Sequence, residues 1–132
     1  MFNNMIDIKL ISPKKGRGVV SKEFIKKGTI IDTAHVILFS NHENDLINKT
    51  IINNYVFEWD DPEDNSEYKN ALAMSFCEFL NHSYTPNVEY EKNFKDKTIK
   101  FYAIKDIQPE IELTINYNGK LDNKNPLWFD LE

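Results

Sequence analysis

The sequence predicts one mainly β domain with little helix. Short runs rich in β-branched and aromatic residues recur at roughly regular spacing along the 132 residues, and turn-forming residues separate them. Hydrophobic residues make up 41% of the chain and aromatic residues 13%, so the chain can bury a modest core. We find no repeat, linker or low-complexity segment, and therefore treat residues 1–132 as a single domain.

The N-terminal part is expected to consist of extended segments joined by turns. Residues 6–10 alternate apolar and polar side chains, as an amphipathic strand does. The run 12–18 contains proline and glycine and should turn the chain, after which residues 19–20 resume an extended segment. A second turn at 26–28 precedes residues 29–39, whose β-branched and apolar side chains predict one or two strands.

The middle of the chain has a weaker pattern. Residues 42–54 are polar with scattered aliphatic side chains, which fits either a short helix or a loop. Residues 55–59 predict a strand, and the acidic run 60–65 predicts a surface loop. Residues 71–75 are apolar and should be buried, and residues 76–80 should form a single helical turn behind them.

The C-terminal half is again expected to be β structure. Residues 88–91 and 98–104 predict two strands, and every second side chain from Ile99 to Ala103 should face the core. Residues 113–117 predict a final strand before an Asn-Gly turn.

Composition and charge exclude several classes of function. The net charge of -5 argues against non-specific binding to nucleic acid or to anionic membranes, and suits a basic partner. The single cysteine, Cys77, allows neither an intrachain disulfide nor a cysteine zinc cluster, and three scattered histidines predict no metal site. No segment is long and apolar enough to span a membrane, so we expect a soluble intracellular protein of the cytoplasm or nucleus.

Four clusters could carry chemistry. They are Lys15–Gly18, Phe79–Asn87, Glu112–Tyr117 and Trp128–Phe129. Glycines let the backbone approach a ligand closely, and a tight polar turn behind an apolar run can present groups to a ligand. Each cluster also has a plain structural explanation: a hairpin turn, a surface loop, a tyrosine at a strand end, and an apolar segment that packs the tail.

In this order the four clusters resemble the SET-domain protein lysine methyltransferases, over nearly the whole chain. The matching segments are Gly16–Val19, Phe24–Ile31, Phe79–Ser83, Pro86–Asn87 and Glu112–Tyr117. The resemblance implies a β-clip fold of short curled sheets, whose C-terminal segment threads under a loop as a pseudoknot. That threading would bring Asn81 and His82 beside Tyr117. Residues 118–132 would form a short post-SET-like tail without cysteines.

The reaction that this resemblance implies moves a methyl group from S-adenosylmethionine to a lysine amine, and it needs no metal. Tyr117 would be the catalytic residue. The cofactor would be bound by Lys15, Gly16, Arg17, Asn81, His82 and Trp128. The lysine channel would be lined by Tyr55, Tyr90, Ile115 and Trp128. An aromatic channel suits lysine because it packs the methylenes and attracts the cationic head.

Purely structural roles remain as alternatives for several of these residues. Gly16 could do no more than form a turn, and His82 could be a hydrogen-bonded core histidine. Phe129 could take the place of Trp128 in closing the channel. A further departure lies in the turn before the final strand, where the family usually has Gly-Glu-Glu-Leu-Thr and this chain has Glu110-Ile111-Glu112-Leu113-Thr114 after Pro109.

The number of methyl groups transferred depends, in the resembled family, on an aromatic residue two positions before the catalytic tyrosine. A tyrosine there holds a water molecule that restricts space. Ile115 cannot hold that water, so we hypothesise that a second or third methyl group is accommodated. Tyr90 instead favours transfer of a single methyl group, because some monomethylating members have a tyrosine at the matching site.

The substrate implied by the resemblance is a lysine in a basic protein tail, such as a histone. The acidic residues of the middle segment could attract such a tail, or could simply be solvated; they are Glu58, Asp60, Asp61, Glu63 and Asp64. A homodimer is plausible because so small a domain has little surface to complete a substrate groove. The competing functions are an inactive SET-like module that binds a peptide or partner, and a plain β scaffold.

Overall fold

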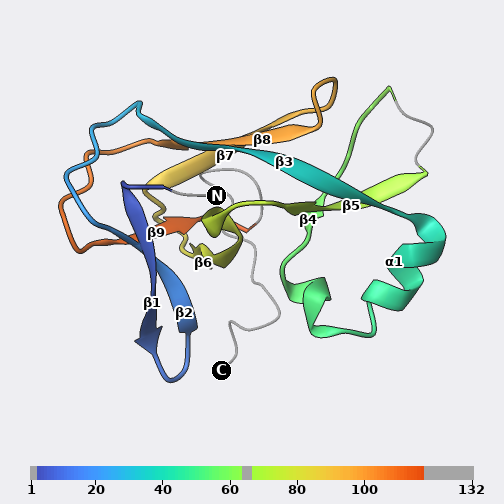
Figure 1. Ribbon diagram of the computed structural model, residues 1–132, viewed down its shortest axis with the longest axis horizontal. Coiled ribbons are helices and arrows are strands. Elements are labelled where there is room, and N and C mark those ends of the chain that lie inside the picture. The colour runs from blue at the N-terminus through green and yellow to red at the C-terminus, as the bar shows by residue number, and fades with distance from the viewer. Residues whose placement is uncertain (1–2, 64–66, 118–132) are drawn as a thin grey trace.

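Two sheets make up the architecture, as Figure 1 shows. The computed structural model describes residues 3–63 and 67–117. One sheet has the strand order β1-β2-β9-β6 and the other has the order β4-β5-β3-β8-β7. The strands are β1 (Ile6–Ser12), β2 (Gly16–Ser21), β3 (Ile30–Ser40), β4 (Phe57–Glu58), β5 (Tyr68–Ala73), β6 (Asn81–His82), β7 (Val88–Asn93), β8 (Thr98–Ala103) and β9 (Glu112–Ile115). The prediction of a mainly β fold of short strands with little helix is confirmed for the described residues.

The four-stranded sheet joins the two ends of the described chain. β9 lies between β2, with which it pairs antiparallel, and β6, with which it pairs parallel. The register places Asn81 opposite Thr114 and His82 opposite Ile115. The polar turn expected at 79–87 is therefore partly wrong, because Asn81–His82 within it form the strand β6. The turn expected at 12–18 is also shorter than predicted, since β2 already begins at Gly16.

The five-stranded sheet is built on one long strand. β3 pairs with β8 through its first half and with β5 through its second half, so the run predicted as one or two strands is a single one with irregular register. β4 is only two residues long, and most of the strand expected at 55–59 is absent. Tyr55 instead ends a short 3-10 helix, where its backbone N–H donates to the Ile52 carbonyl.

Three short helices occur in the described residues. α1 (Asn41–Ile47) begins with a capping box, in which the Ser40 hydroxyl accepts from the Glu43 N–H and the Glu43 carboxylate accepts from the Ser40 N–H. The 3-10 helix η1 (Ile51–Asn54) follows it, so the ambiguous segment 42–54 is helical. The 3-10 helix η2 (Phe76–Phe79) confirms the predicted single turn, and the Ser75 hydroxyl caps it.

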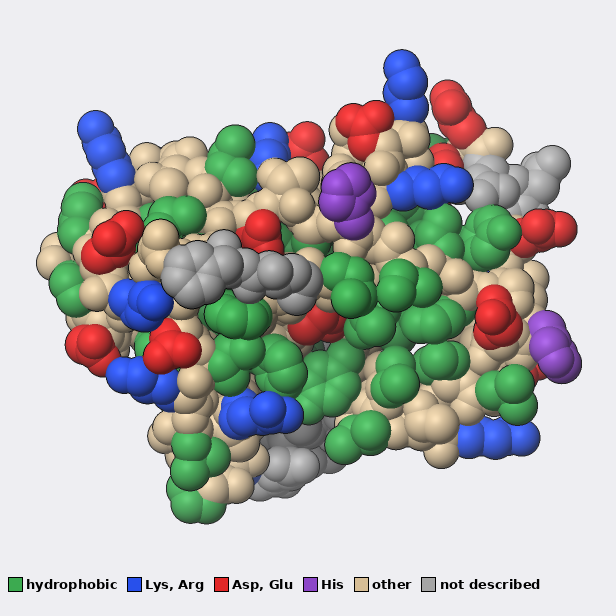
Figure 2. All heavy atoms as spheres, viewed as in Figure 1, with side chains coloured by type: hydrophobic (Ala, Val, Ile, Leu, Met, Phe, Trp, Pro, Cys, Tyr) green, Lys and Arg blue, Asp and Glu red, His purple; other side chains and the backbone are tan. Residues whose placement is uncertain are grey.

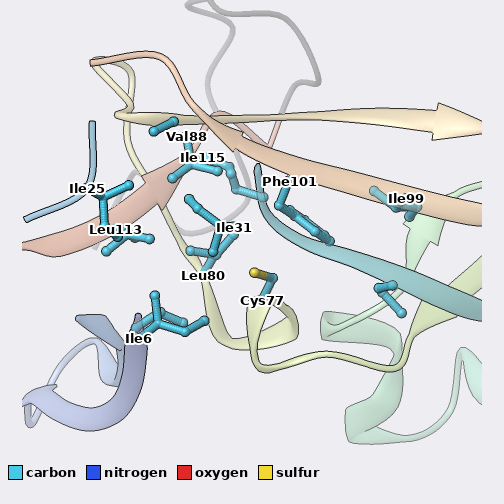
Figure 3. Close-up of a cluster of buried hydrophobic side chains, with 14 of the residues drawn as sticks. Ile6, Ile25, Ile31, Cys77, Leu80, Val88, Ile99, Phe101, Leu113 and Ile115 are labelled. Carbon is cyan, nitrogen blue, oxygen red and sulfur yellow. The ribbon is translucent and has the colours of Figure 1, made fainter. Parts of the chain in front are cut away.

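The core fills the space where both sheets and η2 meet (Figure 3). Ile99, Phe101 and Ala103 are all buried, as the alternation in β8 predicted. From the first sheet come Ile6, Val19, Leu113 and Ile115, and from the segment around η2 come Cys77 and Leu80. Burial on this scale stabilises the fold by about 25 cal/mol for each Å² of apolar surface removed from water. The same packing fixes η2 and β9 against each other.

The turn before β9 explains the departure seen in the sequence. Glu110 has a φ angle of 66°, the left-handed region that favours glycine, and it stands where the family motif has glycine. The fully buried Ser21 holds this turn, because its hydroxyl donates to the Gln108 carbonyl and accepts from the Ile111 N–H. The turn therefore has a left-handed backbone at a residue that is strained by it.

Candidate active site

The site is built where η2 runs into β6 and where β9 ends. The backbone N–H of Tyr117 donates to Nδ1 of His82 at 3.0 Å, and the hydroxyl of Tyr117 donates to the Leu80 carbonyl at 2.6 Å. The rings of His82 and Tyr117 lie 5.3 Å apart. Asn81 and His82 thus do lie beside Tyr117, although 35 residues separate His82 from it in sequence.

Tyr117 is a hydrogen-bond donor throughout the physiological range of pH. Burial, followed by the nearby Tyr55, Glu112 and Glu78, raises the pKa of its hydroxyl to about 12. Its proton is directed at the Leu80 carbonyl. The phenol oxygen therefore stands fixed just after the C-terminal end of β9 and is uncharged.

Next to Asn81 lies a polar group of residues from β2 and β9. The Asn81 amide donates to the Glu112 carboxylate at 2.8 Å and to the Arg17 carbonyl at 3.3 Å. The other oxygen of Glu112 accepts from the Lys15 ammonium at 3.3 Å. The Arg17 guanidinium lies 4.6 Å from the centre of the Phe79 ring. The structure therefore brings Lys15, Arg17 and Asn81 together, as the sequence predicted.

Gly16 and Gly18, the two glycines of β2, differ in the space around them. Gly16 has a φ angle of 72°, and a Cβ added to it would meet nothing within 4 Å. Its backbone is thus open to the close approach of a ligand. Gly18 is buried, and an added Cβ would lie 2.7 Å from Asn81 Nδ2 and 2.9 Å from Glu112 Oε2. The close contact at Gly18 is what allows the Asn81–Glu112 pair to form.

A pocket of about 240 Å³ opens beside Tyr117. It is lined by Asn53, Asn54, Tyr55, Val56, Phe57, Glu58, Cys77, Glu78, Leu80, Tyr90, Lys92, Ile115 and Tyr117. All the predicted channel residues within the described chain line it, namely Tyr55, Tyr90 and Ile115. Trp128 and Phe129, which were expected to close the channel, lie outside the described residues.

Aromatic side chains form the walls of this pocket. Tyr55 meets Phe79 edge to face at 5.8 Å, and Tyr90 meets Phe57 in the same way at 5.1 Å. Burial raises the pKa of the Tyr90 hydroxyl to about 12, so this side chain is neutral as well. A narrow space between neutral aromatic rings suits a long methylene chain with a polar end.

Glu78 is a pocket residue that the sequence reasoning missed. It appeared only as part of the helical turn, although an acidic residue between Phe76 and Phe79 in an apolar run was a signal. Burial raises the pKa of its carboxyl from 4.5 to about 8. The Ala73 N–H donates to one carboxyl oxygen, and the other oxygen is buried without a hydrogen-bond partner in the described chain.

Charges at the pocket rim are mixed. The Lys92 ammonium pairs with Asp60 at 2.6 Å, so one of the acidic residues expected to attract a basic tail is already engaged. Glu58 lines the pocket and is exposed. On the face drawn in Figure 2, lysine and arginine side chains lie apart from one another and among acidic ones, and no basic patch forms on that face.

Residues 3–63 and 67–117 contain no group of three or more histidine, cysteine, aspartate or glutamate side chains that could hold a metal ion. Within the same ranges, no helix is long and apolar enough to cross a membrane.

Comparison with known proteins gives one consistent family. The pattern of the SET domain matches residues 16–118. The chain is 32% identical over 120 residues to a histone-lysine N-methyltransferase of Schizosaccharomyces pombe described as specific for H3 lysine-37, covering 90% of this chain and 74% of that protein. It is 35% identical over 127 residues to an H3 lysine-9 specific enzyme of the same yeast, of which it spans only 24%.

Solved structures agree with the sequence comparison. The crystal structure of a candidate histone methyltransferase from Plasmodium falciparum superposes with a TM-score of 0.64 at 26% identity. The match covers 88% of this chain and 95% of that one. The likeness thus extends over most of both chains.

Proposed function

Because the chain belongs to the SET-domain family of protein lysine methyltransferases, we propose that it transfers a methyl group from S-adenosylmethionine to a lysine in a basic, histone-like protein tail. One observation carries the proposal. The Asn81-His82 strand, the Tyr117 hydroxyl and an aromatic pocket meet at one point of the fold. Such a meeting is what a transfer between a bound cofactor and a channelled lysine requires.

The proposed cofactor residues surround the open backbone of Gly16. S-Adenosylmethionine, when bound, supplies a methyl group on a sulfonium that a neutral amine can displace. Lys15, Gly16 and Arg17 would contact the cofactor chiefly through backbone groups, and Asn81 and His82 would bind its amino-acid end and adenine. In support, Gly16 offers room for close approach, and Asn81 lies against the backbone of Arg17.

Tyr117 would act by position. Its neutral hydroxyl is held by the Leu80 carbonyl at the inner end of the pocket, so its oxygen can accept a hydrogen bond from an incoming amine. The amine nitrogen would thereby be aligned for in-line attack, and alignment of this kind supplies much of the acceleration in a displacement reaction.

The channel would be formed by Tyr55, Tyr90 and Ile115, all of which line the pocket. Trp128, or Phe129 in its place, would close it and cover the cofactor, with residues 118–132 as the closing tail of a single SET domain 1–132. Ile115 leaves room where the family's water-holding tyrosine would stand, which supports a second or third methylation, whereas Tyr90 favours a single one.

The proposed substrate class follows from the relatives and from the charge of the chain. The relatives named above are described as acting on lysines of histone H3. A net charge of -5 and the exposed Glu58 at the pocket favour a lysine- and arginine-rich tail over nucleic acid. The protein would then work in the nucleus or cytoplasm, and a second copy could complete the substrate groove.

An inactive module that binds a peptide without turnover is the alternative. Calorimetry with S-adenosylmethionine separates the two, because a module without a working cofactor site should bind it weakly or not at all. The direct test is transfer of a labelled methyl group from S-adenosylmethionine to purified histones and to total cell lysate. Label on histone lysines is expected, and cofactor binding with no labelled protein in either sample would contradict the proposal.

A further inference from the structure

We propose that Glu78 accepts the proton of the substrate's ammonium group inside the pocket, and so presents a neutral amine beside Tyr117. The proposal rests on the methyl transfer proposed above and adds a proton acceptor to it. The residue lies on η2, and it lines the same pocket as Tyr55, Ile115 and Tyr117.

One carboxyl oxygen of Glu78 has no hydrogen-bond partner among the described residues, and Glu78 lines the pocket. Oε1 accepts from the Ala73 N–H, which fixes the side chain in place. Oε2 is buried and finds no hydrogen-bond partner within the described ranges. A buried carboxyl oxygen without a partner costs free energy, and a donor brought by the substrate would remove that cost. A lysine ammonium carries three such donors.

The other groups around the pocket do not fit this role. The Tyr117 hydroxyl donates to the Leu80 carbonyl, and its pKa of about 12 keeps it protonated. Cys77 is a buried thiol whose pKa is also raised to about 12. Glu58 is exposed at the rim. Glu78 is therefore the buried carboxyl of the pocket among the described residues.

The proton balance is simple. An ammonium with a pKa of about 10.4 in water must become a neutral amine before it can attack. Its N–H bond breaks, the proton moves to Oε2, and the carboxylate becomes a carboxylic acid. Burial lowers the pKa of the ammonium and raises that of Glu78 to about 8, so the transfer between them has a small free-energy change. The acid then returns its proton to water before the next turnover.

Several ionisable groups face Glu78 from the elements packed around it. They are Asp32 on β3 through Ser75, Tyr55 before β4, Glu58 on β4, Cys77 on η2, Tyr90 and Lys92 on β7, and Tyr117 after β9. Because all of them remain in a Glu78→Gln variant, a comparison of that variant with the wild type isolates the ionisation of Glu78.

The first test is the pH dependence of turnover on a lysine peptide. For the wild type, kcat/KM should rise to a plateau with a midpoint near pH 8, because kcat/KM reports the ionisation of the free enzyme. Glu78→Gln should lower kcat/KM about a hundredfold near that pH, and its kcat/KM should keep rising toward the pKa of the free amine. Glu89→Gln, on β7 where its carboxylate accepts from Tyr102, is the matched control and should keep the wild-type profile. Equal rates and an equal midpoint in wild type and Glu78→Gln would overturn the proposal.

The second test does not depend on turnover. A peptide with lysine and the same peptide with norleucine are compared for affinity, at a pH about one unit above the pKa of Glu78. The preference of the wild type for lysine should fall about tenfold in Glu78→Gln, and an unchanged preference would overturn the pairing. If the wild type binds lysine in this way but labels no protein, the proposed methyl transfer fails and the pairing stands.

Discussion

Glu110 is a residue whose backbone conformation destabilises the fold. Its φ angle of 66° is one that a side chain disfavours by about 1–2 kcal/mol. Its only ion pair within the described chain, with Lys9 at 3.3 Å, is largely exposed and contributes little.

Replacing Glu110 should therefore stabilise the fold, provided that the new residue is glycine. Glu110→Gly should raise the free energy of unfolding by about 1 kcal/mol relative to Glu110→Ala, because both variants lose the ion pair and only glycine relieves the backbone. Urea denaturation of the two variants measures this difference. Equal stabilities would mean that the turn does not strain the residue.

The second prediction at the scale of residues concerns Ile115 and the number of methyl groups transferred. Its side chain is buried and lines the pocket beside Tyr117, and it cannot hold a water molecule. Mass spectrometry of a lysine peptide after long incubation should find dimethyl or trimethyl product from the wild type. Ile115→Tyr should shift the product toward monomethyl lysine. Only monomethyl product from the wild type would contradict this, and would give Tyr90 the deciding role.

At the scale of elements, the close packing of β2, β6 and β9 positions the residues of the proposed cofactor site. Gly18→Ala would place a methyl group 2.6 Å from Ile11 Cγ1, 2.7 Å from Asn81 Nδ2 and 2.9 Å from Glu112 Oε2. Because all three are side-chain atoms and none is backbone, the fold should tolerate the change while the Asn81–Glu112 pair separates.

Calorimetry should accordingly find that Gly18→Ala weakens binding of S-adenosylmethionine by about tenfold or more. The melting temperature should fall by only a few degrees, for a loss of about 1 kcal/mol. The control is Lys22→Ala, an exposed position just after β2. If Gly18→Ala binds S-adenosylmethionine with the affinity of the wild type, cofactor binding does not depend on the present position of Asn81.

Some elements of the fold could be predicted from the sequence and others could not. Local patterns predicted β8, η2 and the alternation of Ile99, Phe101 and Ala103, because burial on one face dictates the spacing of apolar residues. The strand character of Asn81-His82 could not be predicted, since it depends on the partner β9 thirty residues away. Glu78 was missed for a related reason: its burial comes from the packing of η2 against other elements.

At the scale of the whole molecule, Glu78 should make stability depend on pH. Its folded pKa of about 8 lies above the value of 4.5 for the free side chain. Between these values the folded chain holds a proton that the unfolded chain has released, so the free energy of unfolding falls as pH rises from 4.5 to about 8.

Glu78→Gln removes this dependence. Its free energy of unfolding should change less over that interval than that of the wild type, by roughly 2 kcal/mol after allowance for partial exposure of the side chain. Thermal or urea unfolding at a series of pH values measures it, with Glu89→Gln as the control. If the free energy of unfolding depends on pH in the same way in the wild type and in Glu78→Gln, burial does not raise the pKa of the Glu78 carboxyl.

In the proposed mechanism, a cofactor site on β2 and β6 meets a lysine pocket at Tyr117. Methyl transfer by Tyr117→Phe, compared with wild type and with Tyr102→Phe, tests that claim most directly. Tyr102 carries a hydroxyl bonded to Glu89 away from the pocket, so its loss should leave transfer unchanged. Tyr117→Phe should retain its fold and lose about a hundredfold or more in rate. Labelling of histones by Tyr117→Phe at the wild-type rate would contradict the account.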